Sequence, residues 1–381
     1  MKQTARIISI HAADTSGVCS MLYELGGMVV VHDASGCNST YSTHDEPRWY
    51  RQDSMIYISA LTETDAILGN DEKLIADVAD AAKDLSPRFI ALCGAPVPLL
   101  AGTDFPAVAA EIEALTGIPT FGLHTGGIHS YLAGASEALE AVVNHFCTDS
   151  LQKTTAPSVN IIGATPLDFS INGTVESMID WLRKSGFELV SCMAMGSTLD
   201  DIRLASAAHV NLVVSSCGIA TAELLQQRFG TPWVAGVPVG EKFPAVLASA
   251  LKTAAENGAC ALPCAERDAS GSDKRLAIPG ESIFSGSLAR AIEADLGKPC
   301  RVLCPLEAED RLLAPGDLRI WDEDEAAAAF AEASGVIADP MYAPVCPPDV
   351  PFIRLPHEAF SGRCYSKESL NLIDRPLPWR L

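Results

Sequence analysis

Three cysteines in the N-terminal part of the chain have the side chain that holds soft metal centres. Cys19 lies in TSGVCSM, Cys37 in HDASGCNS, and Cys93 in LCGAP at the end of an apolar run. Thiolates bind iron–sulfur clusters or zinc in preference to hard cations. A glycine stands close to each cysteine, and glycine lets the backbone approach a bulky cluster and direct amide N–H groups at its sulfides. These cysteines are therefore candidate cluster ligands.

The spacing of these cysteines does not identify a metal site by itself. They are far apart in the sequence and form no local signature such as C-x-x-C. From the residues alone, a buried and inert thiol is the more frequent role of each. The pairs CALPC and CRVLC lack partners at zinc spacing, which favours a structural role. Cys217, after the apolar run VNLVVSS, is either a second-site ligand or substrate contact, or a core cysteine at a helix start.

Two histidines accompany Cys37. His32 either hydrogen-bonds near a metal centre or caps the turn. His44, followed by Asp45 and Glu46, could deliver protons to a reduced substrate, because histidine titrates near neutral pH. A solvated loop is the favoured alternative for this segment. The candidate catalytic residues are thus His32, His44 and Cys217.

The chain repeats one order of elements three times: an apolar strand, a glycine-containing turn, an amphipathic helix and another strand. In the first stretch, residues 71–85 predict a helix, and FIALC (89–93) predicts a buried strand with Cys93 at its carboxyl end. In the second, TVESMIDWLRKSG predicts a helix that ends at Gly186, where a left-handed residue is expected. This alternation is typical of an α/β fold with parallel sheets flanked by helices.

The length and the linkers predict three Rossmann-like domains. A chain of 381 residues exceeds what one hydrophobic core ordinarily supports. The stretch DSLQKTTAPS and a polar, Gly/Ser-rich stretch between about 262 and 275 mark boundaries. The expected domains are a cluster-binding domain (1–155), a middle domain (156–270) and a C-terminal domain (271–381), all Rossmann-like.

Composition excludes several classes of partner. The formal net charge of −21 argues against nucleic acid, because binding a phosphate backbone needs a basic face. No apolar run is long enough to span a bilayer, and the first residues lack a signal-peptide core. We therefore expect a cytoplasmic protein that binds neither nucleic acid nor membrane. Its twelve cysteines are then expected to be reduced, as buried thiols or metal ligands.

The segment 32–74 resembles component 1 of nitrogenase and its relatives. In that family a His-Gly-Pro-x-Gly-Cys turn is followed by a segment of the form T-E-x-D-x-V-F-G-G-x-x-K-L. The counterparts here are His32, Gly36, Cys37, Thr62, Glu63, Asp65, Gly69, Lys73 and Leu74. LCGAPVPLLAGTD is similar to the family's third-cysteine strand, and later segments are similar to its second and third domains. The resemblance covers most of the chain.

This resemblance implies that Cys19, Cys37 and Cys93 ligate an iron–sulfur cluster at a subunit interface. The cluster would be of the 4Fe–4S type or a larger centre like the P-cluster. The partner subunit would be a second copy, giving a homodimer, or a homologous chain, giving a heterodimer. Low-potential electrons would come from a separate, homodimeric, ATP-dependent iron protein. ATP hydrolysis would take place on that partner, because this chain contains no Walker motif G-x-x-x-x-G-K-S/T.

The implied function is that of an oxidoreductase, the catalytic component of a two-component reductase that acts on an unsaturated small molecule held between domains. We identify no equivalent of the family's iron–molybdenum cofactor histidine, and Ser215 stands where the family has its cofactor cysteine. A tetrapyrrole-type substrate is therefore favoured over dinitrogen. The alternative is an iron–sulfur or cofactor assembly scaffold without turnover, and a third possibility is a non-enzymatic binding protein with vestigial cysteines.

Overall fold

The computed structural model describes residue 7 and residues 11–34, 46–267 and 274–380. The chain divides into two compact units. The cysteine unit comprises Ala12–Thr148 and Met193–Arg203. The two-sheet unit comprises Met1–His11, Asp149–Cys192 and Leu204–Leu381. Within the described part of the chain, no helix combines the length and the apolar character needed to cross a bilayer.

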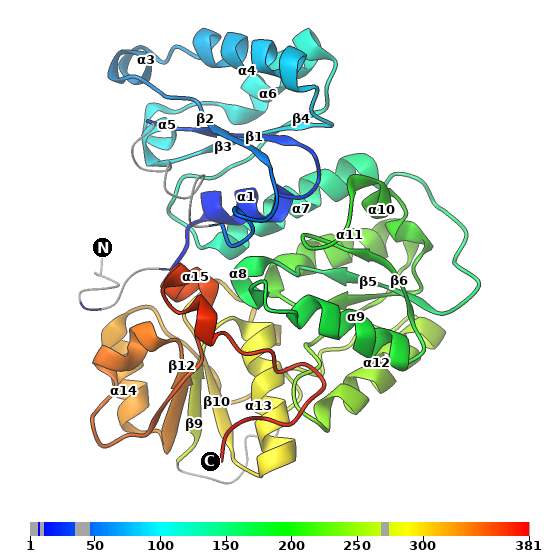
Figure 1. Cartoon of the computed structure of the whole chain (residues 1–381), viewed down its shortest axis with the longest axis vertical. Helices are drawn as coiled ribbons and strands as arrows, with labels where there is room; N and C mark the ends of the chain where they lie inside the picture. Colours follow the sequence, from blue (N-terminus) through cyan, green and yellow to red (C-terminus); the bar gives the residue numbers. More distant parts are fainter. Residues whose placement is uncertain (1–6, 8–10, 35–45, 268–273, 381) are drawn as a thin grey trace. The chain divides into compact units, whose positions relative to one another are not determined.

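The cysteine unit is built on one sheet with the strand order β2-β1-β3-β4 (Figure 1). Its strands are β1 (Met28–His32), β2 (Met55–Ile58), β3 (Ile90–Gly94) and β4 (Thr120–Gly122). Its helices are α1 (Asp14–Leu22), α3 (Glu63–Leu68), α4 (Glu72–Leu85), α5 (Pro96–Ala101), α6 (Phe105–Thr116), α7 (Tyr131–Phe146) and α10 (Leu199–Arg203). Buried apolar side chains of α4 and α6 pack with those of β1 and β3, and this core stabilises the sheet.

The two-sheet unit contains a middle sheet of order β6-β5-β7-β8 and a C-terminal sheet of order β11-β10-β9-β12-β13 (Figure 1). The strands are β5 (Ser158–Ile162), β6 (Glu188–Cys192), β7 (Val210–Val213), β8 (Trp233–Ala235), β9 (Leu276–Pro279), β10 (Cys300–Cys304), β11 (Leu318–Arg319), β12 (Gly335–Ala338) and β13 (Phe352–Arg354). The α-helices are α8 (Pro166–Phe169), α9 (Thr174–Lys184), α11 (Ile219–Phe229), α12 (Phe243–Asn257), α13 (Ser282–Leu296), α14 (Glu323–Ala331) and α15 (Glu358–Ser361). Short 3-10 turns include η2 (Ala205–Ala207), η3 (Ser216–Gly218) and η5 (Pro340–Val345).

All described strand pairs in the three sheets are parallel, and helices flank the sheets, so the predicted α/β fold with parallel sheets flanked by helices is confirmed. In each sheet the strand order reverses once. The reversal falls between β1 and β3, between β5 and β7, and between β9 and β12. Open α/β sheets bind ligands at such points, beyond the carboxyl ends of the strands.

Several elements predicted from the sequence are confirmed. The helix expected over 71–85 is α4, and the strand expected over 89–93 is β3. Gly186 follows α9 with a φ of 90°, in the left-handed region as expected. Helix α10 ends at Arg203, and the 3-10 turn η2 follows it. The division into three domains stays a prediction.

Helices α1 and α7 cross at backbone contact, which fixes the helix that carries Cys19. A Cβ atom placed on Gly17 of α1 would lie 1.9 Å from the carbonyl oxygen of Tyr131 in α7. A Cβ atom on Gly134 of α7 would lie 1.9 Å from the carbonyl oxygen of Asp14. Non-bonded heavy atoms do not approach this closely, so both positions require glycine for the two helices to pack as they do.

We expect Gly17→Ala to destabilise the protein by about 1–3 kcal/mol, because the added methyl group must push α1 away from α7. Helix propensity alone predicts the opposite sign, since alanine is favoured over glycine by roughly 1 kcal/mol in a helix. Urea denaturation followed by circular dichroism measures the difference. The control is Gly117→Asn, because Gly117 ends α6 at a φ of 70° with no atom within 4 Å of an added Cβ. Equal or greater stability of Gly17→Ala would contradict this account.

Candidate functional site

The structure brings together two of the three predicted cluster ligands. Cys19 lies within α1 and Cys93 near the carboxyl end of β3, and both side chains are 0% exposed. The two thiols are hydrogen-bonded to each other and form no disulfide. The Cys93 Sγ atom also lies 3.8 Å from the carbonyl oxygen of Val30. Cys37 lies outside the described residues.

The electrostatic surroundings of Cys93 favour its neutral thiol in the absence of a bound cation. The hydrogen bond with Cys19 and burial together raise the pKa of Cys93 well above its usual value, and the charges of Asp14 and Glu137 act in the same direction. A bound metal ion is the kind of cation that stabilises buried thiolates. Two soft sulfur donors at one buried point are of the type that an iron–sulfur cluster takes, and no third donor joins them among the described residues.

Hydrogen bonds hold the chain that follows Cys93. The carbonyl oxygen of Gly94 accepts from Thr15 Oγ1 (3.1 Å) and from Thr125 Oγ1 (2.9 Å). The N–H of Gly94 donates to Thr125 Oγ1 (2.8 Å), and a Cβ atom at this glycine would lie 2.5 Å from the Phe105 ring. The expectation that this glycine directs its N–H at cluster sulfides is therefore wrong, because that N–H bonds to a side chain and the missing Cβ makes room for an aromatic ring.

Asp14 fixes the start of α1 against a neighbouring loop. Its Oδ1 atom accepts from the N–H groups of Thr15 (2.7 Å) and Gly127 (2.8 Å), and Oδ2 accepts from the N–H of Gly126 (3.2 Å). A carboxylate at the first turn of a helix also interacts favourably with the helix dipole. Asp14 thus positions the helix on which Cys19 lies, five residues further along the same helix.

The structure describes His32 and Glu46 of the predicted catalytic region. His32 ends β1 in register with Gly94, and its Nδ1 lies 2.8 Å from Ser59 Oγ. Burial lowers the pKa of His32, so a neutral imidazole is favoured near pH 7. His44 lies outside the described residues. The sequence favours a solvated loop at Glu46, but this side chain is 1% exposed, because it forms a buried ion pair with Arg48.

Arg48 anchors the chain beyond this segment. Its guanidinium is buried and ion-paired with Glu46 at 2.6 Å and with Glu24 at 2.9 Å. The same group donates to the carbonyl oxygens of Ser20 (2.6 Å) and Ala194 (2.8 Å). Ser20 follows Cys19 directly, so this network holds the carboxyl half of α1.

The Thr-Glu-x-Asp segment builds local structure. Thr62 caps α3 by accepting from the N–H of Asp65 at 3.2 Å, and Gly69 ends the helix in the left-handed region. The hydrogen bond from Thr62 lowers the pKa of the Asp65 carboxyl. Thr62 and Gly69 therefore fix the two ends of α3, a helix of six residues.

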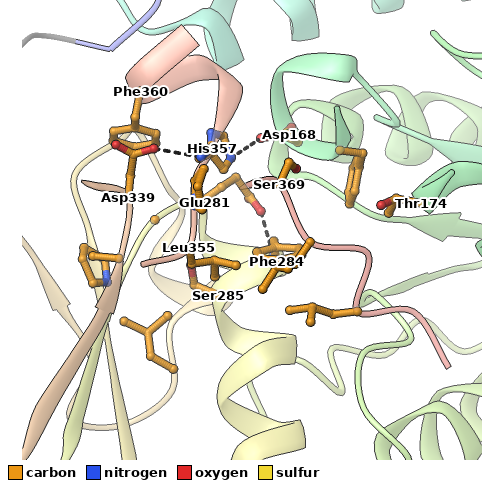
Figure 2. A pocket seen from close by; sticks show the side chains of 18 of the residues that line it. Asp168, Thr174, Glu281, Phe284, Ser285, Asp339, Leu355, His357, Phe360 and Ser369 are labelled. Carbon is orange, nitrogen blue, oxygen red and sulfur yellow. Dashed lines mark hydrogen bonds and ion pairs between the residues drawn. The ribbon is translucent and has the colours of Figure 1, made fainter. Parts of the chain in front are cut away.

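A second candidate site is a pocket inside the two-sheet unit. It lies where the chain leaves the carboxyl ends of β5, β9, β12 and β13, and so at the point where the C-terminal sheet reverses its strand order. Figure 2 shows Asp168, Glu281, Asp339 and His357 around it, with Phe284, Leu355 and Phe360 among the apolar walls. The Asp168 Oδ1 atom lies 3.3 Å from His357 Nε2.

Cys217 lies in the 3-10 turn η3, directly before α11, in the two-sheet unit and is buried. Its Sγ atom lies 3.5 Å from Ser215 Oγ, and burial raises its pKa well above the usual range, with the charge of Asp168 adding to the effect. It is not among the described residues that line the pocket. A role as ligand or substrate contact stays a prediction.

Sequence reasoning missed the residues of this pocket. His357 follows β13, which has only three residues, and Asp168 lies in the four-residue helix α8 after β5. Such short elements give little periodic signal. Their position in the sequence could have indicated them, because both residues follow the carboxyl end of a parallel strand, where α/β sheets bind ligands.

Comparison with known proteins identifies relatives. The family model described as nitrogenase component 1 type oxidoreductase matches residues 15–262. The chain is 26% identical over 187 residues to the nitrogenase molybdenum-iron protein alpha chain of Methanosarcina barkeri, covering 48% of this chain and 34% of that protein. It is 24% identical over 213 residues to the nitrogenase iron-molybdenum cofactor biosynthesis protein NifE of Rippkaea orientalis, covering 54% of this chain and 44% of the relative.

Two further comparisons concern a reductase and a solved structure. The chain is 29% identical over 120 residues to a light-independent protochlorophyllide reductase polypeptide of Nostoc punctiforme, covering 29% of this chain and 24% of that relative. The matched regions thus span less than half the length of these curated relatives. The structure of nitrogenase Cp1 at pH 5 has the same fold, with a TM-score of 0.66, 16% identity and coverage of 96% of this chain and 86% of that one.

We expect Arg48→Met to lower the free energy of unfolding by about 3–5 kcal/mol, because it leaves buried carboxylates without their cation. Urea denaturation followed by circular dichroism provides the measurement. The control is Arg183→Met, which removes an exposed ion pair with Asp180 and should cost less than about 1 kcal/mol. Equal losses in the two variants would show that the Arg48 network contributes little.

Proposed function

Because the chain belongs to the family of nitrogenase component 1 type oxidoreductases, we propose that it is the cluster-bearing, substrate-reducing component of a two-component reductase. A separate ATP-dependent iron protein supplies low-potential electrons in this proposal. The observation that carries the proposal is the meeting of the Cys19 and Cys93 thiols in the interior of the cysteine unit, within the matched region.

The proposed ligands are Cys19, Cys93 and, from the sequence, Cys37. The cluster supplies one-electron storage and transfer at low potential. The chain's own residues hold the thiols in place and exclude water from them. Asp14 fixes the helix of the first cysteine, and Thr125 fixes the backbone after the strand of Cys93.

An exposed apolar patch supports a partner subunit close to this site. The chain passes from Cys93 directly into α5, and α5 contacts α3. The most exposed apolar side chains of the two helices are Leu100 (86%), Ile67 (75%) and Leu68 (72%). Apolar patches of this kind mark protein–protein interfaces. We propose that a second copy of this chain, or a homologous subunit, packs on this patch.

The proposed substrate is an unsaturated small molecule, with a tetrapyrrole favoured over dinitrogen. Similarity to a light-independent protochlorophyllide reductase supports this choice. So does Ser215, which stands at the position where the family resemblance placed a cofactor cysteine. The pocket of the two-sheet unit, with its largely apolar walls, is the proposed place for the reducible part of the substrate.

A scaffold function is the second candidate. Similarity to NifE, whose name describes cofactor biosynthesis, is the observation that favours it. A scaffold would bind a cluster and pass it on without reducing a substrate. Electron-dependent turnover with an iron protein therefore separates the two functions, whereas iron content separates both from a binding protein with vestigial cysteines.

We expect Cys93→Ala, purified without oxygen, to lose the visible absorption, the EPR signal and the bound iron and sulfide of the cluster. A missing thiolate leaves an iron site that a buried pocket cannot complete with water. The control is Cys364→Ala, which removes an exposed cysteine and should leave iron and sulfide unchanged. Full iron content in Cys93→Ala, with circular dichroism confirming that both variants are folded, would refute the proposed ligand set.

A further inference from the structure

Some polar side chains of the pocket in the two-sheet unit form hydrogen bonds that fix the backbone. Asp339 serves the fold, because its Oδ1 accepts from the N–H of Met341 (2.8 Å), and its Oδ2 accepts from the N–H of His357 (2.8 Å) and from Ser361 Oγ (2.7 Å). These bonds fix the backbone at His357. The ring of Phe360 packs edge-on against the imidazole with a centroid distance of 5.1 Å, which restricts its orientation further.

Glu281 also serves the fold. Its carboxylate caps α13 by accepting from the N–H groups of Ile283 (3.0 Å) and Phe284 (2.8 Å). It accepts a third bond from the N–H of Ser216 (3.0 Å), next to the end of β7. Glu281 thus links the middle sheet to the C-terminal sheet. Burial raises the pKa of Glu281, and the negative charge of Asp168 adds to this effect.

Asp168 and His357 lie face to face in the pocket, with 3.3 Å between Oδ1 and Nε2. Their elements, α8 and the start of α15, are already joined by a hydrogen bond of 2.9 Å from Ser170 Oγ to Glu358 Oε1. The described residues that line the pocket include no lysine or arginine. Among these residues, His357 is therefore the group that can carry a positive charge. It faces Asp168, with Glu281 and Asp339 also around the pocket (Figure 2).

We propose that His357, oriented by Asp168, is the proton donor to the substrate that this chain reduces. The inference rests on the proposed reductase function. An imidazole is a common general acid in enzymes, and a neighbouring carboxylate orients its ring. The position at the carboxyl ends of four parallel strands is where α/β sheets place such groups.

The proton balance of the step is simple. Saturation of one double bond requires two electrons and two protons, and an external one-electron iron–sulfur donor supplies the electrons one at a time. For each proton, an N–H bond of the His357 imidazolium breaks and its electron pair stays on the nitrogen. The proton forms a new bond to the substrate carbon. Asp168 Oδ1 lies 3.3 Å from Nε2 and orients the ring, and the imidazole takes up a new proton before the second transfer.

The surroundings also define the part of the substrate that enters. Apolar side chains make most of the walls, and the carboxyl groups among the lining residues belong to Asp168, Glu281 and Asp339. A substrate carboxylate at this point would be repelled by Asp168 and would lose its hydration. The part that enters is therefore an uncharged, conjugated carbon framework, while acidic side groups of the substrate stay outside the pocket.

The test compares His357→Gln and Asp168→Asn with wild type in the complete system of cluster-loaded chain, iron protein, ATP and reductant. Protochlorophyllide and a panel of porphyrins and partly reduced tetrapyrroles serve as probes. We expect His357→Gln to lower kcat by about 10²-fold or more, because general acid catalysis contributes about that much. Asp168→Asn should lower it in the same direction. Binding of protochlorophyllide to cluster-free protein, followed by its fluorescence, should be unchanged in both.

Two control variants separate proton donation from a structural role. His124→Gln removes an exposed histidine that is paired with Glu137 in the cysteine unit, and should keep the wild-type kcat. Ser170→Ala removes the neighbouring link between α8 and α15, and should also keep it. A kcat of His357→Gln close to wild type, or equal losses in His357→Gln and Ser170→Ala, would overturn the inference alone. A cluster-loaded wild type that reduces no probe would overturn the reductase function and this inference together.

Discussion

The backbone contact between α1 and α7 is the constraint on which the cysteine site depends. Cys19 belongs to a helix and Cys93 to a strand, and their thiols meet only because α1 lies close against its neighbour. Gly17 and Gly134 permit that approach, and Asp14 and Arg48 hold the two ends of α1. The site is therefore a product of helix packing and buried polar bonds, with no local ligand motif in the sequence.

The three sheets place chemistry by one topological rule. In the cysteine unit, His32 and Cys93 end the two strands between which the order reverses. In the two-sheet unit, the pocket lies beyond β9 and β12, the strands of the corresponding reversal. Adjacent loops leave such a point in opposite directions, and the opening between them accepts a ligand without breaking the sheet. One topological rule thus accounts for the position of both candidate sites.

The sequence predicted the fold better than the sites. Helix 71–85 and the strand ending at Cys93 have strong periodic patterns, so both were found. Glu46 lies in a polar stretch that looked solvated, and only its pairing with Arg48 explains its burial. The pocket residue His357 follows a strand too short to show a pattern, and its partner Asp168 is far away in the sequence. Contacts of this long range depend on tertiary packing, which periodicity does not encode.

Buried carboxylates explain how an acidic chain stabilises loops at its sites. Asp14, Glu281 and Asp339 each accept at least three hydrogen bonds, and most of the donors are backbone N–H groups. Such charge-assisted bonds offset the desolvation of the carboxylate and fix a loop without a cationic partner. Each of these loops lies beside a side chain that could react, which is a thiol in the cysteine unit and an imidazole in the two-sheet unit. The carboxylates therefore provide rigidity to the loops that carry the candidate site residues.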